Sequence, residues 1–191
     1  MYSKDISPII SHAYSSSQGL YDVIEFAMLT IRRPISLVGS AKLRVRTQGI
    51  QNGGLTEPAA AGLLWSYAYK DLIARQLRLA TSVESAMSTF LCIKGIGLAK
   101  SAFCAQLVGY PVGCLDTWNL KELGVKEPTL NKQAGKKHWS NAIGRYIELQ
   151  QHKTAEQWWD DWCYNVAGNR HNKSLPSAEK VSNYHVEVIT Q

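Results

Sequence analysis

The chain has 191 residues, which is enough to bury a substantial core and favours one compact protein. Apolar residues make up 45% of the sequence, but no run approaches the roughly 18 to 20 apolar residues that a membrane-spanning helix requires, so no membrane contact is expected. The formal net charge of +6 is compatible with a polyanionic partner, although charge alone does not identify one.

The N-terminus and the cysteines favour an intracellular protein. Met1–Asp5 lacks the basic stretch and apolar run that open an export signal. The cysteines lie among apolar or aromatic residues and form no Cys-x-x-Cys pair, which is typical of reduced core thiols; they are Cys92, Cys104, Cys114 and Cys163. Since the histidines also lack ligand spacing, neither a metal nor another cofactor is expected.

The first part of the chain gives one clear helix. Residues 1–18 show little periodicity and predict either a loosely ordered N-terminal arm or a short helix followed by a linker. From Gly19 to Ile31 apolar residues recur at three- and four-residue steps, which predicts an amphipathic helix that Pro34 ends. Residues 19–191 are then expected to form a single helical domain with two lobes.

The next segment is the most one-sided in charge. Between Phe26 and Thr56 there is no acidic residue, while the basic residues are Arg32, Arg33, Lys42, Arg44 and Arg46. We expect a long connection from Pro34 to Leu55, which is either a solvated loop that happens to be basic or a loop that faces phosphates. In the second case Arg44 and Arg46 are candidate DNA contacts.

Cap signals predict the two helices that follow. Thr56 is a good N-cap and Pro58 suits the first turn of a long helix over Ala59–Leu79. Thr81, with Glu84 three residues later, has the spacing of a capping box before a shorter helix.

The C-terminal part is also predicted to be helical. Helices are expected over Thr117–Leu123 and Lys136–Gln151, after a capping box of Thr154 and Gln157, and after Ser177. Three tryptophans stand at helical spacing and are expected to pack in the core: Trp158, Trp159 and Trp162. No segment alternates as a strand does, so the predicted fold class is all-α.

Between residues 82 and 108, two helical stretches are joined by Gly95-Ile96-Gly97. Glycines two apart let the backbone turn sharply, and the next helix points free N–H groups and the positive end of its dipole outward. Such a turn suits a phosphate oxygen, and Lys94 and Lys100 flank it. The alternative is that the glycines only end a helix and that the lysines are solvated.

Past the second helix, Gly109-Tyr110-Pro111 forms a stop and Leu115-Asp116-Thr117-Trp118 opens another helix. This order resembles the helix-hairpin-helix DNA glycosylase superfamily. That family has a Leu-Pro-Gly-Val-Gly hairpin, a Phe-Gly-x-Pro turn and then a Val-Asp-Thr-His segment with its essential aspartate. The resemblance implies a bilobal helical bundle of the DNA glycosylase type.

The resemblance also implies a function for Asp116. Beside a scissile glycosidic bond, its carboxylate would stabilise an oxocarbenium-like sugar or orient a nucleophile. The alternative is that Asp116 is only the N-cap of the helix from Thr117, which is worth about 1 kcal/mol. Trp118 is a candidate for stacking on an everted base, with packing in the core as its alternative.

The departures from the family narrow the chemistry. Members with lyase activity place a Schiff-base lysine where this chain has Ala99. Lys100 is adjacent, but one residue along a helix rotates a side chain by about 100°, so we expect Lys100 to face phosphate or solvent. The family's cysteine-rich motif is absent, so no iron–sulfur cluster is expected.

The leading hypothesis is a DNA-binding enzyme that acts on a flipped nucleotide, most simply by monofunctional N-glycosidic base excision without lyase activity. One alternative on the same fold is the modification of hypermodified pyrimidines in phage DNA. The other is a non-catalytic helix-hairpin-helix protein that binds DNA or a host factor. In each DNA-dependent case the expected location is the cytoplasm, in association with the nucleoid.

Overall fold

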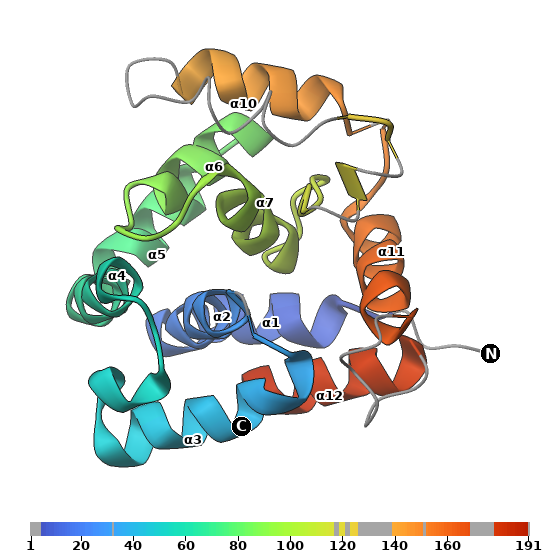
Figure 1. Ribbon diagram of the computed structural model, residues 1–191. Coiled ribbons are helices and arrows are strands. Elements are labelled where there is room, and N and C mark those ends of the chain that lie inside the picture. The colour runs from blue at the N-terminus through green and yellow to red at the C-terminus, as the bar shows by residue number, and fades with distance from the viewer. Residues whose placement is uncertain are drawn as a thin grey trace.

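A computed structural model describes residues 5–31, 33–116, 119–120, 123–125, 139–150, 152–168 and 178–190. Helices and no strands occur in these ranges, which confirms the predicted all-α class. Figure 1 shows a lower group of helices, α1 (Ser7–Ser15), α2 (Ser17–Leu29), α3 (Val38–Gln48) and α12 (Ala178–Thr190). The upper group contains α5 (Lys70–Leu79), α6 (Val83–Leu91), α7 (Leu98–Leu107) and α10 (Trp139–Glu148). At the two sides of this view are α4 (Glu57–Ala68) and α11 (Ala155–Gly168).

Helix α2 is the centre of the core. It contacts α1, α3, α4, α5, α7 and α12, and every residue from Gly19 to Leu29 is buried. A helix that is apolar on nearly all sides is stable only when other helices surround it. Its start is fixed by Ser16, whose hydroxyl accepts a hydrogen bond from the amide of Gly19 at 2.9 Å.

The N-terminal segment does not stand apart from this core. Residues 7–15 form α1, the second of the two alternatives that the sequence left open. Ile6 and Ile9 are fully buried, and α1 contacts α2, α7 and α12.

The prediction of a long loop between Pro34 and Leu55 is wrong. This segment forms α3, flanked by the short 3₁₀ helices η1 (Ile35–Leu37) and η2 (Ile50–Gly53). The buried residues of α3 do follow helical spacing, but one of them is Lys42. Its ammonium donates hydrogen bonds to the carbonyl oxygens of Val188 and Ile189 at the end of α12. This helix could not be predicted from the sequence, because the carbonyl groups that bind the buried Lys42 lie at the far end of the chain.

The prediction of a single long helix over residues 59–79 is also wrong. It breaks at Tyr69, where φ is −111° and ψ is 19°, to give α4 and α5. Buried Ser66 and Ile73 lie on either side of the break, two helical turns apart in the sequence. The apolar periodicity therefore continues through the bend and cannot reveal it.

The capping boxes were partly predicted. The cap of α6 is Ser82, with Ser85, and not Thr81 with Glu84; their hydroxyls accept from each other's amides at 3.2 and 3.0 Å. The box of Thr154 and Gln157 is confirmed, with amide hydrogen bonds of 2.8 and 3.3 Å.

Aromatic side chains of α11 form part of the core, as predicted. Trp158, Trp159 and Trp162 are nearly fully buried, and the rings of Trp159 and Trp162 stack at 5.5 Å. Three cysteines are buried thiols as expected, whereas Cys92 is exposed on the surface.

Candidate functional site

The hairpin turn, residues 92–97, joins α6 to α7 where the sequence predicted it. Two hydrogen bonds between residues three apart in the sequence shape it. The amide of Ile93 donates to the Phe90 carbonyl at 3.0 Å, and the amide of Ile96 donates to the Ile93 carbonyl at 3.1 Å. Ile93 and Ile96 are buried and anchor the turn, while Lys94, Gly95 and Gly97 are exposed. The buried side chain of Ile96 leaves only its backbone for a DNA contact.

Gly95 is explained by conformation and packing. Its φ is +85°, a region that L-amino acids rarely adopt. A Cβ atom here would also lie 2.8 Å from the Cα of Ala59 in α4. In the same contact, a Cβ atom at Gly62 would collide with the carbonyl oxygen of Lys94. The hairpin turn therefore meets α4 backbone to backbone.

Gly97 is not explained in this way. It is the N-cap of α7 with φ −102° and ψ −176°, an extended conformation open to any residue. A Cβ atom here would have no neighbour within 4 Å among the atoms that the structure describes. Amides in the first turn of a helix lack partners within the helix. The space in front of Gly97 is therefore open to a ligand that approaches these amides.

Of the two flanking lysines, Lys94 is exposed as expected but Lys100 is half-buried. The Lys100 ammonium donates a hydrogen bond to the hydroxyl of Thr30, 2.8 Å away, and lies 4.9 Å from the centre of the Phe103 ring. Lys100 thus faces the end of α2 instead of solvent.

The chain turns back along α7 after Gly109, where φ is +92°. Burial raises the pKa of both Cys104 on α7 and Cys114 on the returning segment to about 12, and the positive charge of Lys100 opposes this rise at both thiols. The returning segment therefore passes within electrostatic reach of Lys100, just before Asp116. Neither thiol is ionised at neutral pH.

Two buried side chains, Tyr146 of α10 and Gln150 just after this helix, hold the returning segment. Gln150 accepts a hydrogen bond from the amide of Gly113 at 2.8 Å. The Tyr146 hydroxyl accepts from the amide of Leu115 at 2.5 Å and donates to the carbonyl of Gly113 at 3.3 Å. The ring of Trp158 fills the space that a side chain at Gly113 would need. The backbone before Asp116 is therefore rigidly positioned.

Asp116 itself is half-buried, and its side chain caps the helical residues Asn119 and Leu120. Its Oδ1 accepts a hydrogen bond from the amide of Asn119 at 3.1 Å. The Asn119 side chain donates to the carbonyl of Cys114 at 2.6 Å and accepts from Asn165 of α11 at 3.0 Å. Asp116 is thus an N-cap, and the same frame fixes the direction of its carboxylate. Trp118 lies outside the described residues.

Most of the basic segment is used inside the fold. Arg46 forms ion pairs with Asp22 at 2.9 Å and Glu25 at 3.4 Å. Burial raises the pKa of Glu25, which the charge of Arg46 opposes. Arg33 donates to the carbonyls of residues 53 and 54, whereas Arg44 is exposed. Of the two arginines predicted to contact DNA, Arg46 is thus paired with Asp22 and Glu25, whereas the charge of Arg44 faces solvent away from these two carboxylates.

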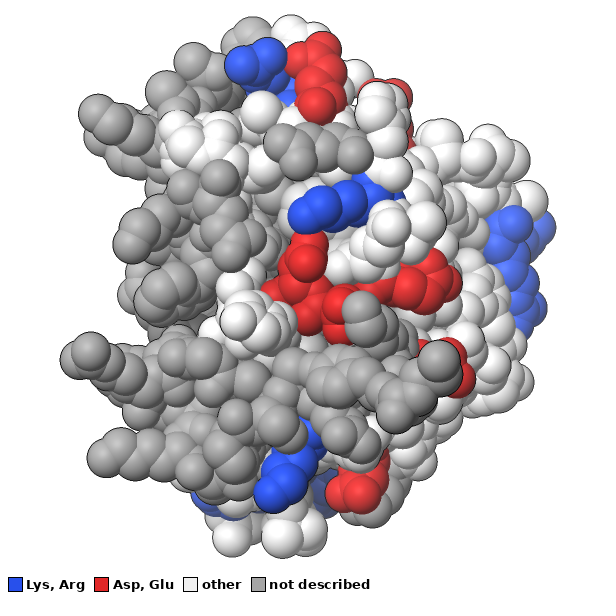
Figure 2. Space-filling model, turned by 90° about the vertical axis from the view of Figure 1, so that its right-hand side faces the viewer, with Lys and Arg blue, Asp and Glu red and all other residues white. Residues whose placement is uncertain are grey.

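Acidic side chains gather on one side of the molecule. Figure 2 looks at the side on which α11 lies, and acidic side chains gather in the middle of this face. Helix α11, on this side, contains the acidic residues Glu156, Asp160 and Asp161, of which Asp161 pairs with Lys153 at 2.6 Å. In Figure 1 the hairpin turn and α4 lie on the opposite side. The face over α11 is therefore unfavourable for a polyanion.

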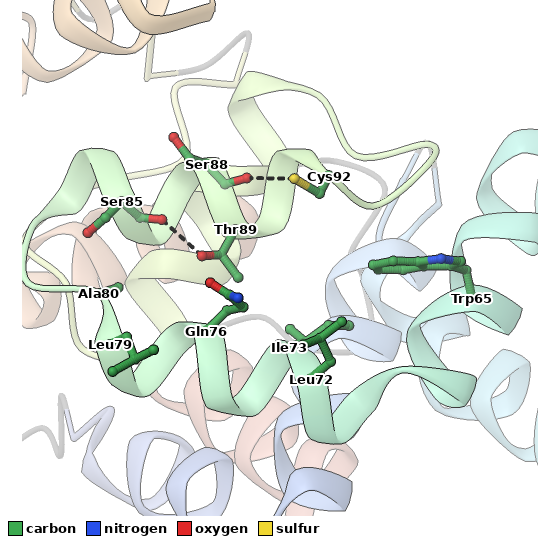
Figure 3. A pocket seen from close by; sticks show the side chains of 10 residues that line it. All are labelled: Trp65, Leu72, Ile73, Gln76, Leu79, Ala80, Ser85, Ser88, Thr89 and Cys92. Atoms are coloured by element: carbon green, nitrogen blue, oxygen red, sulfur yellow. Dashed lines mark hydrogen bonds between the residues drawn. The ribbon is translucent and has the colours of Figure 1, made fainter.

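Two pockets lie near the hairpin turn, and Asp116 lines neither. One, of about 600 Å³, lies beside α5 and α6 and includes Cys92 of the turn (Figure 3). The other, of about 300 Å³, includes Arg33 and the Ala59 that contacts Gly95. Sequence reasoning missed both because their lining residues come from several elements without a local motif.

Within the described ranges no group of three His, Cys, Asp or Glu side chains could hold a metal ion. No helix in that part of the chain is long and apolar enough to cross a membrane. Comparison with protein-family models, curated protein sequences and solved structures finds no match. The functional proposals below are therefore argued from the residues of this chain.

Proposed function

We propose that this protein binds the DNA backbone with its hairpin turn and acts on a nucleotide at Asp116. The observation that carries the first part is Gly97, which neither conformation nor packing requires and whose front is open at the start of α7. A phosphate at this position would meet free amides, the positive end of the helix dipole and the exposed Lys94. Arg44 is the further candidate for a phosphate contact.

The reaction that we propose at Asp116 is monofunctional N-glycosidic base excision. A carboxylate fixed by a rigid backbone is suited to stabilise a developing positive charge on a sugar without reorganisation. The rigidity comes from Tyr146 and Gln150, which hold the preceding residues, and from the amide of Asn119. Lys100 is held by Thr30, so we assign it no Schiff-base function.

The test uses the protein and its Asp116→Asn variant with DNA that carries a panel of damaged and modified bases. Asparagine has nearly the same shape and is an equally good N-cap, so the fold and DNA affinity are expected to persist. We expect mass spectrometry to detect a released base with the parent protein and none with the variant. The matched control is Glu156→Gln, an exposed acid on α11 that should keep full activity.

A non-catalytic DNA-binding protein is the second candidate, and the N-cap hydrogen bond of Asp116 favours it, because this bond alone accounts for an aspartate here. This candidate gives salt-dependent DNA binding and no change in any base of the panel. Base release that depends on Asp116 would exclude it. DNA binding without a steep salt dependence would contradict both candidates.

A further inference from the structure

The larger pocket lies between α5 and α6, and its walls differ in character (Figure 3). Trp65 of α4 closes one end, and Leu72 and Ile73 of α5 form an apolar side. On the facing side, Thr89 of α6 points toward α5 and its hydroxyl donates a hydrogen bond to the carbonyl of Ser85 at 3.0 Å, whereas the hydroxyl of Ser88 points away. Its volume of about 600 Å³ lies within the usual range for small-ligand sites.

Among the residues that the structure describes, no charged side chain lines this pocket, and this determines which class of ligand it can bind. A phosphate would lose its hydration there without gaining a cation. An uncharged ring would fit better, because its faces can contact Trp65 and Leu72 while its edge meets hydroxyl and amide groups. Gln76 is exposed and its amide can both donate and accept hydrogen bonds, and the Thr89 hydroxyl can accept one. A nucleobase combines this flat apolar face with a hydrogen-bonding edge.

The pocket shares its walls with the hairpin turn. Cys92 lines the pocket and is the first residue of that turn. Trp65 belongs to α4, which packs against the turn through Gly62 and Ala59. A DNA strand whose phosphate lies at Gly97 would therefore pass near the opening of the pocket.

We propose that this pocket receives an unstacked base of the DNA strand that the hairpin turn holds. The inference rests on the proposed backbone binding. Because Asp116 does not line the pocket, the base held here is separate from the nucleotide at Asp116. Paired bases are inaccessible to such a pocket, so the protein should prefer single-stranded DNA, or duplex with an unpaired base, over intact duplex.

The test measures binding of single-stranded oligonucleotides by the parent protein and by Trp65→Ala. Loss of a base–aromatic stack should raise Kd by about 5- to 150-fold. An oligonucleotide series with one abasic position, moved along the strand, identifies the base concerned. At that position Trp65→Ala should cause no further loss, because the two changes remove the same contact. The control is Tyr164→Ala, an aromatic residue of α11 that is 73% exposed and should bind as the parent does.

A second variant guards against a folding defect in Trp65→Ala. Gln76→Ala removes the amide group of the pocket at an exposed position of α5, and should also weaken binding. Cys92 gives an independent readout, since it is exposed while the other three cysteines are buried. Bound oligonucleotide should slow the alkylation of Cys92 by N-ethylmaleimide.

The outcomes separate this inference from the proposed function. If the parent protein binds no DNA, the backbone proposal fails and this inference fails with it. If the parent binds but both pocket variants bind equally well and Cys92 is not protected, the pocket proposal alone is overturned. A loss with both variants, together with abasic sensitivity at one position, supports it.

Discussion

The Cα atom of Ala59 lies 2.8 Å from the position that a Cβ atom would take at Gly95. At Gly97, two residues later, that position has no neighbour within 4 Å among the described atoms. The two glycines of one turn therefore have different physical reasons to be glycine. Gly95 serves the contact with α4, whereas Gly97 leaves space in front of the start of α7.

This difference predicts opposite effects of substitution. Gly95→Ala should lower the free energy of unfolding by about 1 to 3 kcal/mol, through its positive φ and its clash with α4. Gly97→Asn and Gly97→Asp should both fold, because each side chain is a good N-cap. Only the aspartate repels a phosphate, so DNA affinity should fall much further with Asp than with Asn. Urea unfolding and DNA titration measure the two effects, and equal affinities of this matched pair would contradict the phosphate site.

Substitutions of Arg44 and Arg46 should give different results in the same two measurements, unfolding and DNA binding. Arg44→Ala should leave stability within about 0.5 kcal/mol and lower the salt dependence of DNA binding by about one phosphate contact. Arg46→Ala removes one partner of each of the buried acids Asp22 and Glu25, which are 6% and 1% exposed. Because Arg46 is itself partly exposed, we expect a loss of about 1 to 3 kcal/mol in unfolding free energy. Its salt dependence should match that of the parent protein, and a reduced slope would show that Arg46 also contacts phosphate.

Helices with a continuous apolar stripe were predictable from the sequence, as α2 shows. Helix α3 was not, because its buried stripe includes Lys42, whose partners are carbonyls at the end of α12. The bend at Tyr69 was hidden for the opposite reason, since the apolar spacing continues across it. Periodicity thus reports which residues face the core, and not where a helix bends or which remote group satisfies a buried charge.

The hairpin turn was predictable because its glycines form a local motif. The hydrogen bonds that hold the backbone before Asp116 were not, since Tyr146 of α10 and Gln150 just after it meet residues 113–115 only in the folded chain. The pocket between α5 and α6 was not predictable for the same reason, because its lining residues come from three separate helices. Lys100 shows a further limit, because spacing gave its position on α7 but not its hydrogen bond to Thr30.

The Tyr146 hydroxyl should matter for both stability and activity. Burial raises its pKa well above the usual value, so the phenol stays protonated and can donate to Gly113 while it accepts from Leu115. Tyr146→Phe leaves that buried amide and carbonyl without this partner, which should lower the free energy of unfolding by about 1 to 3 kcal/mol. If Asp116 is catalytic, kcat should fall while DNA affinity is kept. Tyr164→Phe, at an exposed position, is the control for both measurements, and unchanged stability of Tyr146→Phe would contradict the frame.

His185 should make the fold sensitive to acid. It is fully buried among aromatic rings, with Phe26 and Trp162 each at 4.9 Å, and neither ring nitrogen has a hydrogen-bond partner among the described residues. Burial lowers the pKa of His185 from 6.5 to about 3. Between these values the unfolded chain binds a proton that the folded chain does not, so stability is full above pH 6.5 and falls as the pH drops toward 3.

Each pH unit within this window should remove about 1.4 kcal/mol, so the unfolding free energy should fall by about 2 kcal/mol from pH 7 to pH 5. His185→Phe keeps an aromatic ring among Phe26 and Trp162 but cannot take up a proton, so most of this fall should disappear. His152→Asn, at an exposed position, should retain it. Urea unfolding at several pH values measures the slope for each protein. An equally steep fall in His185→Phe would assign the acid sensitivity to other groups, because the substituted residue no longer titrates.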